Sequence, residues 1–221
     1  MAGLGLAPAP AGASGRAFLR AGSVWDWACA VPLLILAVLL FVRPSLPLDD
    51  AYITLHNARA LLAGGADPVY AGSTALTGAT SAVHLVLIAI LGLLLPLELA
   101  SKLVTLMAIL LYAAGLIALL RRLQCPPGAR AVILVSGLMV GYMPYHLLNG
   151  LESGLALAAI VWGLALIDSK WLPLLCGVMP FVRPELAFLA APLFFYRCWL
   201  GRRNLRRLAL NAAVALAAAA P

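Results

Sequence analysis

Two adjacent aspartates, Asp49 and Asp50, follow an apolar run directly and are the first residues that could do chemistry. Neighbouring carboxylates repel each other, which favours a proton on one of them and suits it to act as a general base. The alternative is structural, because an aspartate at the start of a helix caps free N–H groups, and Gly64-Gly65 can end that helix about four turns later. One aspartate is enough for a cap, so both interpretations of the pair remain open.

A second candidate is Glu152, which lies in the segment Asn149–Gly154 between two apolar runs. An ionisable residue beside a membrane span is energetically costly, and its presence there indicates a functional site. The alternative is that the carboxylate stands at the head of a helix and interacts with the helix dipole.

A third candidate is the segment Arg183-Pro184-Glu185. The apolar run before it, 171–182, would rise only about 18 Å as a helix, which is less than the roughly 30 Å of a bilayer core. We therefore predict that Arg183 and Glu185 lie at the tip of a helix hairpin recessed into the membrane. The alternative is an Arg–Glu ion pair that holds this tip together, which does not exclude a role in substrate binding.

The remaining polar residues give weaker signals. The segment 77–81 is rich in small hydroxylated residues and can serve simply as a helix cap. His84 and His146 have no ligand-like partners in the sequence, and the four cysteines form no CxxC pair, so neither residue type predicts a metal site. Walker loops, HExxH motifs and serine-hydrolase elbows are absent from the sequence, so soluble nucleotide chemistry is unsupported.

The composition decides which elements position these residues. Hydrophobic residues make up 64% of the chain and charged residues 10%, against roughly 25% charged residues in a soluble domain. In hydrocarbon only helices or a closed barrel satisfy every backbone group, and these Leu/Ala/Val-rich runs show no polar–apolar alternation. We therefore predict an all-α fold, a polytopic transmembrane helical bundle. The net charge of +7 arises from basic residues at the ends of apolar runs, so it indicates membrane orientation and not nucleic-acid binding.

The predicted organisation is a disordered cytoplasmic tail at 1–23 followed by a transmembrane domain at 24–221. The first apolar run is expected to be an uncleaved anchor and not a signal peptide. A last run begins at 208 and stops before reaching the roughly 20 residues of a full span, so we expect a truncated protein. The runs between these ends lie at 27–42, 82–97, 103–120, 131–148, 153–167, 171–182 and 186–200.

The distribution of charge gives the topology. With the N-terminus inside and the run at 82–97 lying in the interface, all 15 lysines and arginines except Arg43, Arg59, Lys102 and Arg183 face the cytoplasm. An arrangement with the N-terminus outside and 82–97 crossing gives the same ratio. We prefer interfacial helices in an external loop at 43–97, because 82–97 is short for a span. Most acidic residues then gather on the outer face, which is itself a reason to expect a site there.

Four segments, in this order, resemble the N-terminal half of the GT-C glycosyltransferases, multispanning enzymes that use polyprenyl-phosphate sugars. They are Asp49-Asp50-Ala51-Tyr52-Ile53, Gly78–Ser81, Gly150-Leu151-Glu152 and Arg183-Pro184-Glu185. The closest branch looks like bacterial membrane proteins related to the cell-wall arabinofuranosyltransferases, and the resemblance covers about residues 25–200. It implies an Asp-Asp pair on the first external loop followed by interfacial helices, which agrees with the preferred topology.

The resemblance also implies a reaction. One aspartate of the pair deprotonates an acceptor hydroxyl, prenyl phosphate leaves, and the sugar passes with inversion to an extracytoplasmic glycan or lipid. Cations meet the phosphate, and further carboxylates position hydroxyls or help to hold a divalent cation. The candidates are Asp49 and Asp50 for the base, Arg183 and Arg59 for the phosphate, and Glu152 and Glu185 for the hydroxyls. Many relatives have an arginine where His56 stands, so donor recognition is expected to differ there.

The expected location is the bacterial inner membrane, with a multi-pass chain whose site faces the extracytoplasmic side. Two other interpretations remain: an inactive fragment of a glycosyltransferase, and a transporter or flippase in which broken helices form the substrate path. A transporter would carry polar residues along several spans, but the runs at 103–120 and 131–148 contain almost none.

Overall fold

The computed structural model describes residues 24–64 and 79–201, and in addition 213, 214 and 217. Every regular element in these residues is helical, which confirms the all-α prediction. The predicted tail at 1–23, the loop residues 65–78 and most of the last apolar run lie outside the described residues. The elements are α1 (Val24–Val42), α2 (Asp49–Leu62), α3 (Ala82–Gly92), α4 (Leu97–Arg122), α5 (Pro127–Met139), α6 (Met143–Leu148), α7 (Ser153–Ala165), α8 (Leu172–Val182), the 3-10 turn η2 (Pro184–Leu186) and α9 (Ala187–Gly201).

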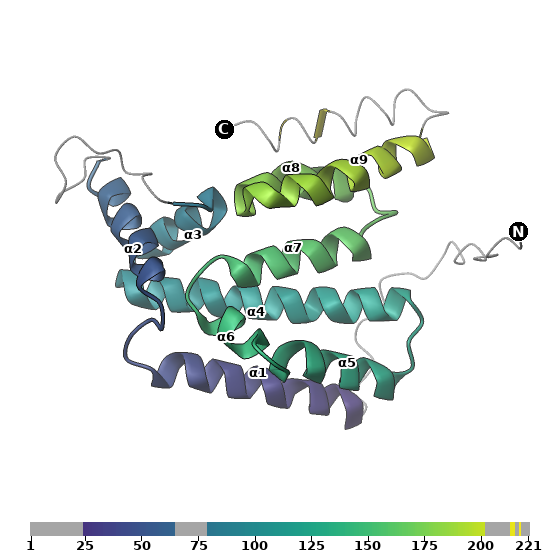
Figure 1. The fold of residues 1–221 in the computed structure, drawn as a ribbon, viewed down its shortest axis with the longest axis horizontal. Coiled ribbons are helices and arrows are strands. Elements are labelled where there is room, and N and C mark those ends of the chain that lie inside the picture. Colours follow the sequence, from purple (N-terminus) through teal and green to yellow (C-terminus); the bar gives the residue numbers. More distant parts are fainter. Residues whose placement is uncertain (1–23, 65–78, 202–212, 215–216, 218–221) are drawn as a thin grey trace, which may run out of the picture.

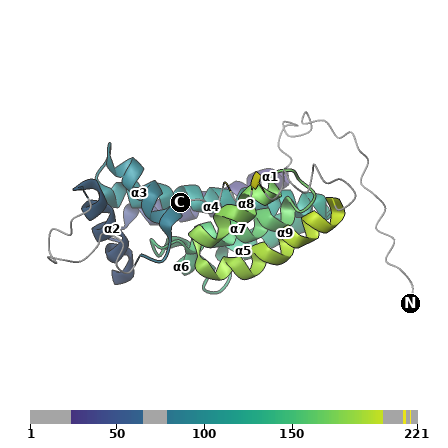
Figure 2. The same ribbon diagram turned by 90° about the horizontal axis from the view of Figure 1, so that it is seen from above.

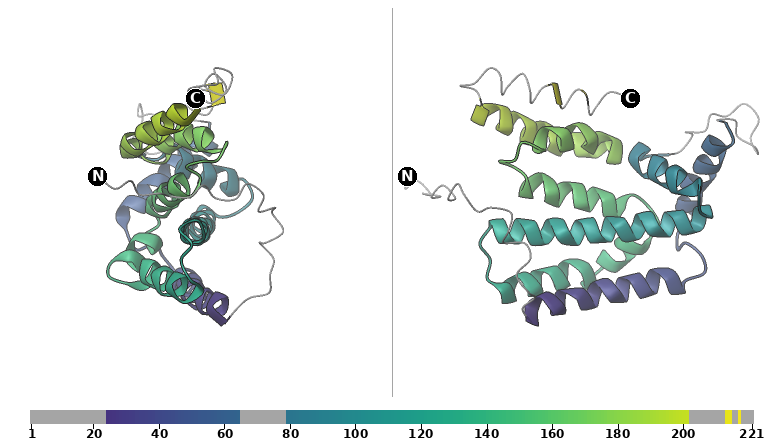
Figure 3. Two further views of the ribbon diagram at one scale, coloured as in Figure 1. Left: turned by 90° about the vertical axis from the view of Figure 1, so that its right-hand side faces the viewer. Right: turned by 180° about the vertical axis from the view of Figure 1, so that it is seen from behind.

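Most of these helices run along one direction, and α2 and α3 lie together at one end of them (Figure 1). The view from above shows the same elongated body with α2 and α3 at its end (Figure 2). α1 packs on α5, α4 on α7 and α8 on α9, so α4 and α7 stand between the other two pairs (Figure 3). The polar segments predicted to do chemistry must therefore be sought at the end where α2 and α3 lie.

The long helix α4 runs through the centre of the bundle. Its 26 residues rise about 39 Å, which exceeds the roughly 30 Å of a bilayer core. Among the described residues it is the one helix long and apolar enough to cross a membrane by length and composition. Glu98 lies in its first turn and Arg121 and Arg122 in its last. The predicted span at 103–120 is thus contained within a single helix.

Small residues allow α4 and α7 to approach each other closely. A Cβ atom added to Gly115 would lie 2.7 Å from a methyl carbon of Val161 and 2.9 Å from the indole of Trp162. The indole Nε1 of Trp162 donates a hydrogen bond of 2.9 Å to the carbonyl oxygen of Leu111, one turn before Gly115. Close packing of this kind, through small residues, is typical of helices that associate within a membrane.

The apolar run at 82–97 does not form one helix. α3 ends at Gly92, a turn follows, and α4 begins at Leu97. The 11 residues of α3 rise about 16 Å, which is too short to cross a bilayer. α3 packs against α2 and α4 at one end of the bundle.

The apolar run at 131–148 is not one continuous helix, because it is divided into α5 and α6. α5 ends at Met139, Val140 is extended, and Gly141 has a φ of +63°, a conformation that ends a helix at little cost only for glycine. Pro144 then stands in the first turn of α6, where its missing N–H is not needed. The sequence Gly-Tyr-Met-Pro contained this signal.

The predicted hairpin after residue 171 is confirmed. α8 ends at Val182, Arg183 is extended (φ −152°, ψ 134°), and Pro184 opens η2. α8 and α9 pack side by side (Figure 1). Arg183 and Glu185 lie in the short connection between the two helices.

Candidate functional site

Glu152 is the buried centre of the site. It stands at the N-cap position of α7, its side chain makes no capping hydrogen bond, and the residue is only 4% exposed. The Thr80 hydroxyl donates a hydrogen bond of 2.9 Å to Glu152 Oε1, and Arg183 Nε lies 3.2 Å from the same oxygen. The carboxylate therefore joins segments that are 72 and 31 residues away in the sequence. It also stands at the head of a helix, as the dipole interpretation expected, but its contacts extend beyond α7.

Gly150 brings the start of α2 to this centre. Its φ is +79°, and a Cβ atom added to it would lie 3.1 Å from the Ala51 Cβ and 3.2 Å from a methyl carbon of Leu46. Asn149 Oδ1 accepts a hydrogen bond of 3.0 Å from the Leu151 N–H, which fixes the same loop. The residue after the aspartate pair is therefore in contact with the loop that carries Glu152.

Asp49 and Asp50 lie in the first turn of α2, and neither caps it. The N-cap residue is Leu48, without a side-chain capping bond, so the predicted cap by an aspartate is wrong. The rest of the structural interpretation agrees with the fold, because α2 begins at Asp49 and ends at Leu62, and Gly64 follows it with a φ of +93°. Both aspartates are exposed, and among the described residues neither carboxylate forms a hydrogen bond or an ion pair. Two exposed, unpaired carboxylates in the first turn of α2 are free to act on a ligand.

Arg183 contacts Glu152 and also lines a cavity. The buried Nε–H is not directed at the carboxylate, so the contact at 3.2 Å is an ion pair without a hydrogen bond. The cavity measures about 350 Å³, and His146, Ser153 and Glu185 also line it. The ion pair predicted within the tip is therefore made with Glu152, while Glu185 is exposed at the cavity.

The start of α3 covers the cluster from the side. Ser81 caps α3 by accepting a hydrogen bond of 3.1 Å from the His84 N–H, and its hydroxyl donates a bond of 3.4 Å to the Phe181 carbonyl near the end of α8. The hydroxylated segment is thus a helix cap, as predicted, and Thr80 adds a contact to Glu152 that the sequence did not indicate. Thr77 and Gly78 of that segment lie outside the described residues.

His84 is a member of the cluster that sequence reasoning set aside. The residue is 1% exposed, and neither ring nitrogen has a hydrogen-bond partner in the part of the chain that the structure describes. Burial lowers the pKa of His84 from its ordinary value near 6.5 to about 4, and the negative charge of Glu152 offsets part of this shift. Its position in the first turn of an apolar helix was visible in the sequence, but its proximity to Glu152 depends on how α3 packs.

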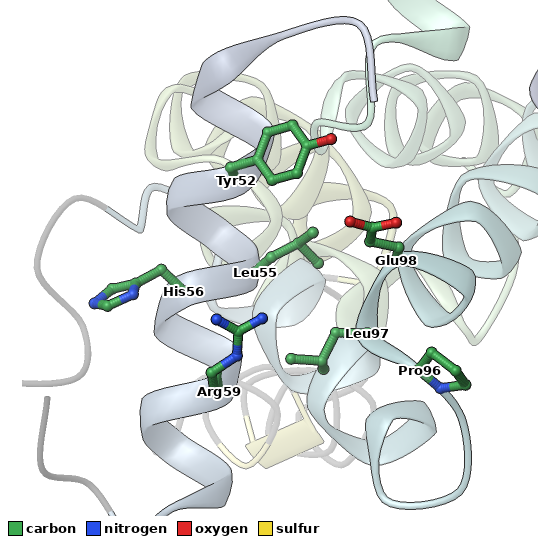
Figure 4. A pocket seen from close by; sticks show the side chains of 7 residues that line it. All are labelled: Tyr52, Leu55, His56, Arg59, Pro96, Leu97 and Glu98. Atoms are coloured by element: carbon green, nitrogen blue, oxygen red, sulfur yellow. The ribbon is translucent and has the colours of Figure 1, made fainter. Parts of the chain in front are cut away.

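Arg59 and His56 line a different cavity, between α2 and the start of α4. It measures about 460 Å³, and its lining does not include Glu152 or Arg183. Tyr52 and Arg59 extend from α2 toward α4, and Glu98 extends from α4 toward α2 (Figure 4). The predicted phosphate-binding cations Arg59 and Arg183 therefore do not share one cavity.

Glu152 and Glu185 were expected to help hold a cation, but a cation site needs further ligands. Within residues 24–64 and 79–201, no three His, Cys, Asp or Glu side chains lie close enough together to hold a metal ion. The chemistry of the site must therefore be argued from its charges and its hydroxyl group.

Comparison with protein-family models, with curated proteins and with solved structures gives no match. Function is consequently argued from the geometry of the site and not from the fold.

Proposed function

We propose that this chain belongs to a polytopic membrane glycosyltransferase of the GT-C type. It transfers a sugar from a polyprenyl-phosphate donor to an extracytoplasmic glycan or lipid acceptor, with inversion. One observation carries this proposal: four segments far apart in the sequence meet at one end of the helical bundle, through Ala51, Thr80, Gly150, Glu152 and Arg183.

The outward-facing side chains of the bundle support a membrane location. Val42 in α1, Val132 in α5, and Phe188 and Phe195 in α9 are 75%, 63%, 84% and 70% exposed. Large apolar surfaces of this kind are unfavourable in water and suit hydrocarbon. With the long apolar helix α4, they support a bundle that crosses the membrane several times, with α2 and α3 in the interface on the extracytoplasmic side.

The short helices of the bundle make the site accessible to a lipid-linked donor. α7 and α8 have 13 and 11 residues and rise about 20 Å and 16 Å, so neither matches a full bilayer core. α4 extends beyond their ends toward α2 and α3 (Figure 1). Glu152 and Arg183 would therefore lie below the outer membrane surface, at a depth that the phosphate of a prenyl lipid can reach.

In the proposed reaction, one carboxylate of the Asp49–Asp50 pair accepts the proton of the acceptor hydroxyl. The acceptor oxygen forms a bond to the anomeric carbon, the bond from that carbon to the phosphate oxygen breaks, and the electron pair leaves with prenyl phosphate. Arg183 stabilises the departing phosphate, because a cation at the developing charge lowers the barrier. Glu152 holds Arg183 in place through the contact with its Nε atom, and Glu185 at the same cavity positions sugar hydroxyls.

The distribution of polar groups favours transfer over transport. A transporter lines a path along its spans with polar groups. In α4 the charged residues are Glu98 and Lys102 near one end and Arg121 and Arg122 at the other. The Lys102 Nζ donates a hydrogen bond of 2.5 Å to the Arg43 carbonyl, so it ties α4 to the α1–α2 connection.

The test is transfer from a labelled polyprenyl-phosphate sugar in membranes that contain the protein. Asp49→Asn, Asp50→Asn and Glu152→Gln are compared with the unchanged protein, and we expect at least one aspartate change and the glutamate change to lower transfer by about 100-fold or more. Asp168→Asn is the matched control, because Asp168 pairs with Arg122 at the opposite end of the bundle and should leave transfer intact. Transfer that survives all three site changes contradicts the proposed function.

A further inference from the structure

The groove between α2 and α4 contains two opposite charges that do not neutralise each other. Arg59 projects from α2 and Glu98 from the first turn of α4, and both line the cavity of about 460 Å³ (Figure 4). Among the described residues, neither side chain forms an ion pair with the other or with a third group. The volume lies in the range of small-molecule sites and far above the roughly 30 Å³ of one water molecule. A ligand that fills this groove can satisfy both charges only if it carries an anion and a cation.

The surroundings of the groove are apolar. Leu55, Pro96 and Leu97 form part of its wall. The turn before Pro96 presents Leu93 and Leu94, which are 70% and 86% exposed. Neighbouring exposed leucines on one short turn suit contact with hydrocarbon and are unfavourable in water.

Tyr52 gives the groove the character of a membrane–water interface. Its ring lines the cavity, while its hydroxyl accepts a hydrogen bond of 3.2 Å from the Leu46 N–H. Tyrosines with one polar end and one apolar face are enriched at the level of lipid headgroups. The occupant of the groove should therefore combine a charged head with an apolar body.

We propose that the α2–α4 groove binds the headgroup of a phospholipid with a phosphate and a primary ammonium group, namely phosphatidylethanolamine. The phosphate lies on the Arg59 guanidinium, which can bind two phosphate oxygens at once. The ammonium donates hydrogen bonds to the Glu98 carboxylate, and the acyl chains lie along Leu93 and Leu94. This assignment needs the membrane location proposed above, but it does not need the glycosyl transfer.

Headgroup chemistry distinguishes this ligand from other lipids. A choline headgroup carries a charge but no N–H donor for Glu98, and a glycerol headgroup leaves the carboxylate without a cation. A prenyl phosphate carries no cation for Glu98, and its negative charge would lie near the negative carboxylate. Each of these should bind more weakly than phosphatidylethanolamine, and neutralising Glu98 should remove the difference.

Lipid binding to the purified protein in detergent, measured by native mass spectrometry, tests this assignment. The titrated lipids are phosphatidylethanolamine, phosphatidylcholine, phosphatidylglycerol and a prenyl monophosphate. We expect phosphatidylethanolamine to bind at least about tenfold more tightly than the others, as one charge-assisted hydrogen bond implies. Arg59→Gln should weaken its binding by about tenfold, and Glu98→Gln should abolish the preference over phosphatidylcholine.

Arg43→Gln is the matched control, because Arg43 is exposed near the same end of the bundle and outside the groove. Helical circular dichroism of each variant confirms folding, and Glu98→Asp should retain part of the preference. Equal binding of the four lipids, or a preference that survives Glu98→Gln, overturns the assignment. Tighter binding of the prenyl phosphate also overturns it and assigns Arg59 to the donor. Because no sugar donor is present, these outcomes are separate from failure of the transfer assay.

Discussion

The hydrogen bond between Thr80 and Glu152 joins the start of α3 to the start of α7, and its contribution to stability can be measured. A hydrogen bond to a charged group contributes about 1.5–3 kcal/mol, and the lower value applies here because Thr80 is exposed. The ion pair with Arg183 adds about 1 kcal/mol at most, since the Arg183 side chain is 42% exposed. We therefore expect Thr80→Val to destabilise the protein by about 1.5 kcal/mol and Glu152→Gln by about 2 kcal/mol.

A double-mutant cycle isolates the contact. Equilibrium unfolding in mixed micelles is followed by circular dichroism for Thr80→Val, Glu152→Gln and the double variant, after reversibility has been checked. We expect a coupling energy of about 1 kcal/mol. Glu152→Gln removes the charged acceptor of the Thr80 hydroxyl, and Thr80→Val removes the donor to Glu152. Thr105→Val is the control. The Thr105 hydroxyl is buried in α4 and has no hydrogen-bond partner among the described residues, so its removal should not destabilise the protein. Single-variant effects that add to within about 0.5 kcal/mol would refute the contact.

Three further predictions follow from the same structure. Gly150→Ala should lower the free energy of unfolding by about 1–2 kcal/mol, because φ is +79° there. It should also lower sugar transfer, because the added methyl group would displace Ala51 and the aspartates beside it. Unchanged transfer in membranes would contradict this. The pKa of His84 is about 4 in the folded protein and about 6.5 in the unfolded chain, so the unfolded chain binds a proton first. The free energy of unfolding is therefore highest above pH 6.5 and decreases as the pH falls toward 4. Between pH 7 and pH 5 this loss should reach about 2 kcal/mol, and His84→Leu should abolish it in unfolding measured at both pH values. Gly115→Leu should destabilise the protein by about 2 kcal/mol, because its side chain would overlap Trp162; an unfolding transition equal to that of the unchanged protein would contradict the packing of α4 on α7.

The sequence was sufficient to predict the all-α fold and the break at Arg183. Both follow from local rules: long runs without alternation form helices, and an extended residue before proline ends one. The division of the run at 131–148 follows from equally local signals at Gly141 and Pro144, which the high hydrophobicity of the run obscured.

Contacts between distant segments could not be predicted in the same way. Glu185 is the nearest carboxylate to Arg183 in sequence, but Glu152 pairs with it, because the packing of α7 beside α8 sets that distance. His84 lies within the field of Glu152 only because the Ser81 cap docks on the end of α8. The groove with Arg59 and Glu98 depends on the tight turn at Gly92, where an added Cβ would overlap the Leu97 side chain. Residue spacing along the chain specifies none of these contacts.

The transfer reaction of the double variant Asp49→Asn/Asp50→Asn tests the central claim most directly. The two carboxylates are the proposed proton acceptors, whereas Arg183 and the cavity beside it remain unchanged, so donor binding should persist. We predict that this variant binds labelled polyprenyl-phosphate sugar as the unchanged protein does, yet gives no detectable transfer, while Asp168→Asn transfers normally. Transfer at the normal rate without either aspartate would contradict the assignment of this site as a glycosyltransferase centre.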